Sequence, residues 1–268
     1  MKFTNSLKYT ILLLLIFVMA ACGNGETADE TEENNASGDA VEGTITVSAA
    51  ASLVDALEEV TERFNEEYPE VQVDFNFGGS GALMQQIMQG APADLFFSAN
   101  EGHFEEVVAK GYIDEEHTVD LLRNEIVLVV PEGSDTVSSF DDLENADQIG
   151  IGNPESVPAG EYSMEAFENM DIMEEIESKF IFATDVRQVL NYVETENVDA
   201  GVVYHTDALT GDGIEVVDTA LEDSHSPIIY PLGTLNDTDN PKAQRAFYEF
   251  VQSEEAGEVF NEYGFIIE

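Results

Sequence analysis

Basic residues are scarce in this chain of 268 residues. Lys and Arg together number 9, against 56 Asp and Glu, which gives a formal net charge of −47. Nucleic-acid phosphates are held by clustered Lys and Arg, and anionic lipids attract basic surfaces. The composition therefore argues strongly against a nucleic-acid partner and excludes adhesion to a membrane through a basic face.

Cysteine occurs once, at Cys22. One cysteine can form neither an intramolecular disulfide nor a multi-cysteine metal site. The four histidines include no pair at the i, i+4 spacing that places two zinc ligands on one helix face. We therefore expect no protein ligands to a metal ion and no cofactor.

The excess of acidic residues predicts a salt-adapted protein. A large net charge destabilises the compact state by self-repulsion. Screening shortens the range of this repulsion from about 10 Å in 0.1 M salt to about 3 Å in 1 M salt. We expect urea unfolding to require more denaturant in 1 M than in 0.1 M salt. Equal stability at the two salt concentrations would contradict this prediction.

Residues 1–21 resemble a secretory signal, with two lysines, an apolar run from residue 9 to 21 and no acidic residue. The run ends in VMAACG, which resembles the lipobox of bacterial lipoproteins. In that family the cysteine, here Cys22, takes a diacylglycerol and becomes the mature N-terminus, and two acyl chains suffice for stable anchoring. Residues 22–43 are polar without a basic residue, which predicts a flexible acidic tether. An ordinary signal or a transmembrane helix is the alternative.

Strand-like and helix-like patterns alternate from residue 44 onward. Strands are predicted at 44–47, 71–77, 94–98, 126–130, 148–151, 179–183, 199–204 and 228–232. Helices are predicted at 53–68, 81–89, 101–110, 159–170, 186–196, 241–252 and 254–263. This rhythm is typical of an α/β protein with mostly parallel sheets and helices on both faces. Ligands of such folds bind at the carboxyl ends of the strands.

Four strand-to-helix junctions, at 49–55, 77–82, 153–160 and 183–187, share features that favour anion binding. Ser52 is predicted to be an N-cap and Asp185 another, while the glycines of the second junction allow close backbone approach. Pro158 suits a first helical turn. Helix N-termini have N–H groups without partners and a partial positive charge, so they bind anions without Lys or Arg.

Several segments resemble, in the same order, the periplasmic molybdate-binding protein family (ModA). They are ITVSAAASL at 45–53, GAPADLFFSA at 90–99, GNP at 152–154, VPAG at 157–160, DVR at 185–187, GVVY at 201–204, EDSH at 222–225 and FNEYGF at 260–265. The resemblance implies a two-lobed periplasmic-binding-protein fold (type II), with mixed, mostly parallel sheets, helices on both faces and the ligand in the cleft between the lobes. It places residues 44–123 and 207–268 in lobe 1, and 124–206 in lobe 2.

The resemblance also implies a ligand set for a tetrahedral oxyanion: Ser52, Ser80, Ala159, Val186 and Tyr204. The two serines would donate from hydroxyl and amide, Ala159 and Val186 from backbone N–H, and Tyr204 from its phenol. Arg187 lies in the same motif without being among the family's ligands, so we expect a structural role for it. Donors alone would disfavour phosphate, which carries a proton near pH 7 that would find no acceptor.

These features predict a monomeric, non-catalytic solute-binding lipoprotein. It would be anchored to the outer face of the cell membrane through Cys22, capture molybdate or tungstate, and deliver it to the permease of an ABC transporter. Another tetrahedral oxyanion such as sulfate is one alternative. A secreted esterase using Ser80 is the other, because GGSGA at 78–82 half-resembles a nucleophile elbow. The fifth position is Ala82, and none of the histidines stands in a recognisable triad context.

Overall fold

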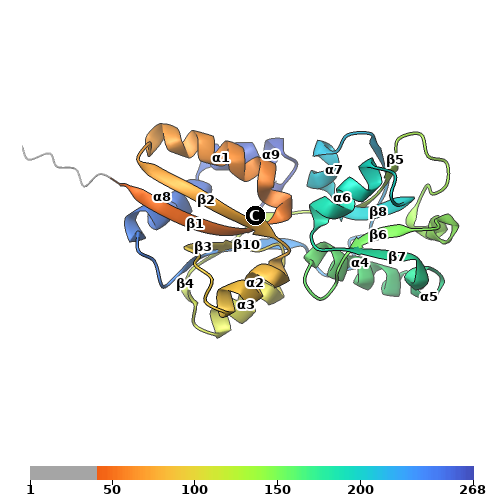
Figure 1. Cartoon of the computed structure of the whole chain (residues 1–268), viewed down its shortest axis with the longest axis horizontal. Coiled ribbons are helices and arrows are strands. Elements are labelled where there is room, and N and C mark those ends of the chain that lie inside the picture. The colour runs from red at the N-terminus through yellow and green to blue at the C-terminus, as the bar shows by residue number, and fades with distance from the viewer. Residues whose placement is uncertain (1–40) are drawn as a thin grey trace, which may run out of the picture. The chain divides into compact units, whose positions relative to one another are not determined.

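The computed structural model describes residues 41–268, which form two β-sheets flanked by helices (Figure 1). The signal sequence, Cys22 and nearly all of the tether lie outside the described residues. In the part of the chain described, no helix is both long and apolar enough to span a membrane.

The first sheet has six strands in the order β11-β4-β10-β3-β1-β2. They are β1 (Gly43–Ala50), β2 (Val71–Gly78), β3 (Leu95–Phe97), β4 (Ile113–Arg123), β10 (Ile229–Leu235) and β11 (Ile266–Ile267). Strand β1 pairs parallel with β2 and β3, whereas β10 pairs antiparallel with β3 and β4. We call this sheet and its helices the first lobe.

The second sheet has five strands in the order β7-β6-β8-β5-β9. They are β5 (Ile126–Pro131), β6 (Ile149–Gly152), β7 (Phe180–Ala183), β8 (Ala200–Tyr204) and β9 (Ile214–Thr219). Strand β6 pairs parallel with β7 and β8, and β5 pairs antiparallel with β8 and β9. We call this sheet and its helices the second lobe.

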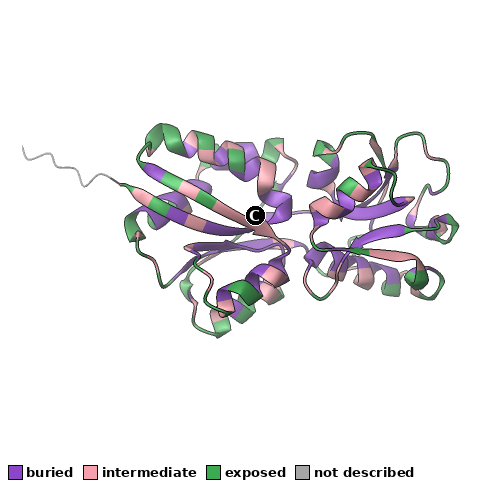
Figure 2. Cartoon of the chain, in the orientation of Figure 1, coloured by how far each residue is buried: buried purple, intermediate pink, exposed green. Residues whose placement is uncertain are grey.

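Helices cover both faces of each sheet, so the central strands, such as β3, β5, β6 and β8, are the most deeply buried elements (Figure 2). In the first lobe α1 (Val54–Glu67), α8 (Pro241–Val251) and α9 (Glu254–Glu262) pack together on one face, and α2 (Ser80–Met88) and α3 (Glu101–Ala109) on the other. The second lobe contains α4 (Pro158–Asn169), α5 (Met173–Ile176), α6 (Val186–Glu194) and α7 (His205–Thr210). Short 3-10 helices lie at Ala51–Leu53, Phe140–Asn145 and Glu177–Lys179.

Helix α6 shows how the sequence pattern directs this packing. Its buried residues, Val186, Val189, Leu190 and Val193, follow the i, i+3, i+4, i+7 spacing of one helix face. Strand β5, in contrast, is a continuous buried run of β-branched and Leu residues, as expected of a strand covered on both sides. The α/β class and two-sheet architecture expected from the sequence are therefore confirmed.

Two details of the prediction are wrong. The sheets are mixed, as expected, but parallel pairs do not predominate, because β4, β5, β9, β10 and β11 all pair antiparallel with their neighbours. The chain also does not return to the first lobe at residue 207, because β9 extends the second sheet beside β5. We therefore place the end of the second lobe beyond Thr219.

Candidate functional site

A small cavity lies between the two lobes, at the carboxyl ends of strands from both sheets. Ala50 ends β1, Gly78 ends β2 and Tyr204 ends β8, and all three residues line the cavity. The complete lining is Ala50, Ala51, Ser52, Gly78, Gly79, Ser80, Ala99, Val157, Pro158, Ala159, Val186 and Tyr204. The cavity encloses about 10 Å³, which is about the room that one water-sized group needs. None of the lining residues carries a charge.

All five residues of the expected ligand set therefore lie around one cavity: Ser52, Ser80, Ala159, Val186 and Tyr204. They come from both lobes, since the serines belong to the first and the other three to the second. No residue of the set is placed elsewhere.

Helix N-termini supply backbone donors to this cavity. Ser80 and Val186 are the first residues of α2 and α6, and Ala159 is the second residue of α4. N–H groups at these positions have no carbonyl partner within their own helix. The three helix starts also give the cavity a partial positive charge without any cationic side chain.

Of the two expected N-caps and the expected first-turn proline, one cap and the proline are confirmed. The Asp185 side chain accepts from the backbone N–H of Gln188 at 2.9 Å, and Pro158 occupies the first turn of α4. Ser52, however, is not an N-cap. It lies inside the 3-10 helix Ala51–Leu53, and its hydroxyl contacts Tyr230 instead.

The Ser80 hydroxyl can donate a hydrogen bond to the cavity that it lines. Its Oγ accepts a hydrogen bond from the backbone N–H of Ala99 at 2.9 Å, so the hydroxyl proton remains to be donated. Among residues 41–268 no imidazole or carboxylate is hydrogen-bonded to this hydroxyl, as a serine nucleophile would require.

The Tyr204 hydroxyl is a second donor. The side chain is 1% exposed, and its hydroxyl has no hydrogen-bond partner within the described residues. Burial raises the pKa of Tyr204 well above its ordinary value, so the phenol keeps its proton. A buried donor without a partner costs free energy, and an acceptor bound in the cavity would recover it.

The two lobes are in direct contact around the cavity. The backbone N–H of Gly81 in α2 donates to the carbonyl of Ser156 in the second lobe at 3.0 Å. At Gly79 an added Cβ would lie 2.5 Å from that carbonyl, so only glycine allows this approach. The Asn100 amide of the first lobe also donates to Glu161 of the second at 3.2 Å.

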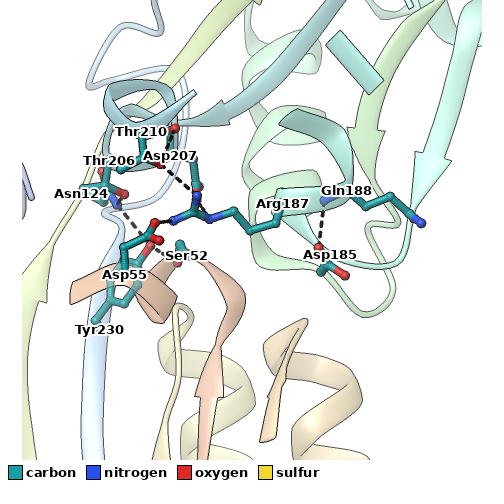
Figure 3. A network of polar contacts seen from close by, with 10 residues as sticks. All are labelled: Ser52, Asp55, Asn124, Asp185, Arg187, Gln188, Thr206, Asp207, Thr210 and Tyr230. Atoms are coloured by element: carbon teal, nitrogen blue, oxygen red, sulfur yellow. Dashed lines mark hydrogen bonds and ion pairs between the residues drawn. The ribbon is translucent and has the colours of Figure 1, made fainter. Parts of the chain in front are cut away.

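Arg187 forms an ion-pair network beside the cavity rather than lining it (Figure 3). From α6 its guanidinium bonds to Asp55 of α1, in the other lobe, and to the Thr210 hydroxyl at 2.8 Å. Its Nε lies 2.8 Å from Oδ1 of Asp207, a carboxylate with no exposed surface. The N–H does not point along that contact, so the pair is electrostatic rather than an aligned hydrogen bond. These contacts agree with the structural role expected for Arg187.

We expect Asp207 to make the folded protein less stable as the pH rises from about 4 to about 7. Burial raises the pKa of Asp207 to about 7, against the opposing charge of Arg187. In this range the folded carboxyl holds a proton that the unfolded one, with a pKa near 3.9, has released, so stability falls with pH. Urea unfolding at pH 5 and pH 8 should show a larger loss for the parent than for Asp207→Asn. Equal losses of stability in the parent and in Asp207→Asn would show that Asp207 is not the group whose pKa is raised.

Tyr230 and Asn124 belong to the site but were not among the predicted residues. The Tyr230 hydroxyl lies 2.9 Å from Ser52 Oγ, and the Asn124 amide donates to Tyr230 at 3.2 Å. Neither stands in a segment that resembles a functional motif. Their contacts span 178 and 106 residues of sequence, so only the fold brings them together.

Comparison with known sequences identifies the family. The model of the bacterial extracellular solute-binding proteins matches residues 45–266. The protein YvgL of Bacillus subtilis, assigned as an ABC transporter substrate-binding lipoprotein, is 44% identical over 97% of this chain and 99% of its own. The molybdate-binding protein ModA of Escherichia coli is 37% identical over 84% of this chain and 90% of its own.

Solved structures share the fold. The periplasmic molybdate-binding protein of Azotobacter vinelandii superposes with a TM-score of 0.76 at 19% identity, over 84% of this chain and 99% of its own. The sulfate-binding protein SubI of Mycobacterium tuberculosis superposes with a TM-score of 0.73 at 19% identity, over 83% of this chain and 86% of its own. The family model and the matches in sequence show that the chain belongs to the bacterial extracellular solute-binding proteins, among the relatives of ModA.

Proposed function

We propose that this protein captures molybdate or tungstate outside the cytoplasm and delivers it to the permease of an ABC transporter. The observation that carries the proposal is the cavity between the lobes, which has uncharged hydrogen-bond donors on several sides and no charged lining residue. The expected ligands are Ser52, Ser80, Ala159, Val186 and Tyr204. Closure of the lobes around the anion would complete its hydrogen bonds and present a joined surface to the permease.

The donor set explains how an acidic protein could hold a dianion. Each proposed contact is neutral, so binding depends on satisfying the anion's oxygens rather than on pairing with a cation. The helix N-termini of α2, α4 and α6 add favourable partial charge at short range. Salt screens the repulsion from distant acidic residues.

The names of relatives support the same ligand. ModA of Escherichia coli, 37% identical to this chain, is named for molybdate. The naming of YvgL as a lipoprotein agrees with a lipid anchor on Cys22, which would keep the protein near its transporter and raise its effective concentration there. We propose that it acts as a monomer without a cofactor and without catalysis.

Sulfate is the second candidate, because the cavity is small. A space of about 10 Å³ is smaller than any tetrahedral oxyanion, so either anion requires the lobes to separate slightly, and sulfate, the smaller of the two, requires less separation. Sulfate, like molybdate, is fully ionised near neutral pH and would satisfy the same donors.

Replacing Ser80 by Ala tests the proposed site. The substitution removes one donor to a charged acceptor, so we expect molybdate affinity to fall by about 1.5–3 kcal/mol, roughly ten- to a hundredfold. Calorimetric titration measures the change. Ser224→Ala is the matched control, because Ser224 is also buried and donates to a backbone carbonyl, that of Leu221, away from the cavity. Unchanged molybdate affinity in a folded Ser80→Ala protein would remove Ser80 from the site.

A further inference from the structure

Ser52 is held by a chain of hydrogen bonds that reaches the crossing between the lobes (Figure 3). Asn124 lies between β4 of the first sheet and β5 of the second. Its Oδ1 accepts from the backbone N–H of Glu125 at 2.9 Å. Because that N–H can only donate, the amide nitrogen of Asn124 must point the other way.

The amide nitrogen of Asn124 then directs the hydroxyl of Tyr230. Its two N–H groups donate to Thr206 Oγ1 at 2.9 Å and to the Tyr230 oxygen at 3.2 Å. The Tyr230 oxygen is therefore an acceptor toward Asn124, and its own proton is left for Ser52 Oγ at 2.9 Å. Tyr230 has no exposed surface, and burial raises its pKa well above the ordinary value, so this proton stays in place.

The direction of the chain determines what Ser52 can offer to the cavity. With its oxygen accepting from Tyr230, Ser52 has its own hydroxyl proton free, and the residue lines the cavity. In the opposite arrangement, neither Ser52 nor Asn124 would accept the Tyr230 proton, because both would donate to the Tyr230 oxygen. Ser80 follows the same logic, since its oxygen accepts from the backbone of Ala99.

We infer that Tyr230 and Asn124 are specificity-determining residues that hold Ser52 as a hydrogen-bond donor and thereby exclude tetrahedral oxyanions that carry a proton. The inference rests on the proposed function, oxyanion binding in this cavity. Hydrogen phosphate needs one acceptor for its P–OH group, whereas molybdate and sulfate need only donors. A hydroxyl free to rotate could supply that acceptor, but one directed by Tyr230 offers its proton.

The test compares molybdate and phosphate binding at pH 8 in the parent and in Tyr230→Phe. Phosphate is then mainly the dianion, so the two ligands have equal charge and differ in the bound proton. We expect molybdate affinity to fall about tenfold and the molybdate-to-phosphate affinity ratio to fall at least tenfold, or about 1.4 kcal/mol. Calorimetry with molybdate in the presence and absence of excess phosphate measures both.

Two further variants separate the effect of hydrogen-bond direction from a general disturbance of the structure. Tyr112→Phe is the matched control, because its hydroxyl donates to the Met88 carbonyl outside the cavity, and it should leave the ratio unchanged. In Asn124→Asp a carboxylate oxygen replaces the amide nitrogen, so residue 124 accepts from the Tyr230 hydroxyl instead of donating to it. Tyr230 then accepts from Ser52, and the molybdate-to-phosphate affinity ratio should fall further. The added negative charge repels molybdate and hydrogen phosphate equally. The ratio of their affinities therefore still reports the direction of the hydrogen bonds to Ser52.

The outcomes distinguish the two proposals. A parent that binds neither molybdate nor tungstate overturns the proposed function. A parent that binds molybdate, with an unchanged molybdate-to-phosphate ratio in both Tyr230→Phe and Asn124→Asp, overturns the inference about Tyr230 and Asn124. If Tyr230→Phe does not fold, the ratio in Asn124→Asp decides.

Discussion

Replacing Tyr204 by Phe should weaken molybdate binding by about 1.5–3 kcal/mol, the range for a hydrogen bond to a charged group. The hydroxyl is buried beside the cavity and has no partner among the described residues, so a bound anion is the acceptor we expect for it. The same reasoning predicts that the substitution does not weaken the fold, although it weakens binding. Without ligand, loss of this hydroxyl should leave the free energy of unfolding unchanged or raise it, because no internal hydrogen bond is lost.

Calorimetry with molybdate and urea unfolding without ligand together measure both effects of Tyr204→Phe. Tyr112→Phe again serves as the control, because it removes a hydroxyl that does have a protein acceptor. It should leave molybdate affinity unchanged. A Tyr204→Phe protein that binds molybdate as tightly as the parent would show that the phenol does not contact the anion.

Replacing Arg187 by Met should cost about 3 kcal/mol of stability at pH 8. The substitution removes the cation that opposes the burial of Asp207, so its pKa rises further. At pH 8 the folded protein must then either hold an unpaired buried carboxylate or bind a proton to it, and both cost free energy. The loss should be smaller at pH 6, because Asp207 then takes up a proton instead of remaining charged. The link to Asp55 in the other lobe is also lost, so molybdate affinity should fall as closure becomes less favourable.

Arg245→Met is the matched control for Arg187→Met. Arg245 pairs with Glu249 on the surface of α8, where the two side chains are 78% and 60% exposed. Exposed pairs of this kind contribute about 0.5 kcal/mol or less. Urea unfolding of both variants at the two pH values makes the comparison. Equal and small losses for both would mean that Arg187 does not stabilise the buried carboxylate.

The sequence predicts most of the fold because the spacing of hydrophobic residues and the residues that begin and end helices are local properties. The buried run of β5 and the single apolar face of α6 are recognisable without any partner. Strand β4, in contrast, carries the polar sequence IDEEHTVDLLR and is mostly exposed. Its extended conformation depends on pairing with β10 and β11, so its own pattern does not reveal it. Strand β9 was missed for a similar reason, because the antiparallel pair with β5 maintains it.

The residues of the site likewise fall into those that local sequence places and those that only long-range contacts place. Backbone donors such as Val186 can be placed from sequence, because they depend on where a helix begins and on a motif next to that start. The partners of Ser52 cannot, since its apparent capping position is overridden by the contact with Tyr230. Asp207 likewise shows no signal in the sequence, and its altered pKa arises from burial and from Arg187.

The central claim is that the cavity between the lobes binds a fully ionised tetrahedral oxyanion. Calorimetric titration of the compact unit from Ala40 to Glu268, in high salt, with molybdate, tungstate, sulfate and phosphate in parallel, tests it most directly. The account predicts one-to-one binding of molybdate or tungstate, with sulfate at least tenfold weaker, or about 1.4 kcal/mol, and phosphate weaker still. Binding of sulfate alone would overturn the substrate, and a folded protein that binds none of the four anions would contradict the claim.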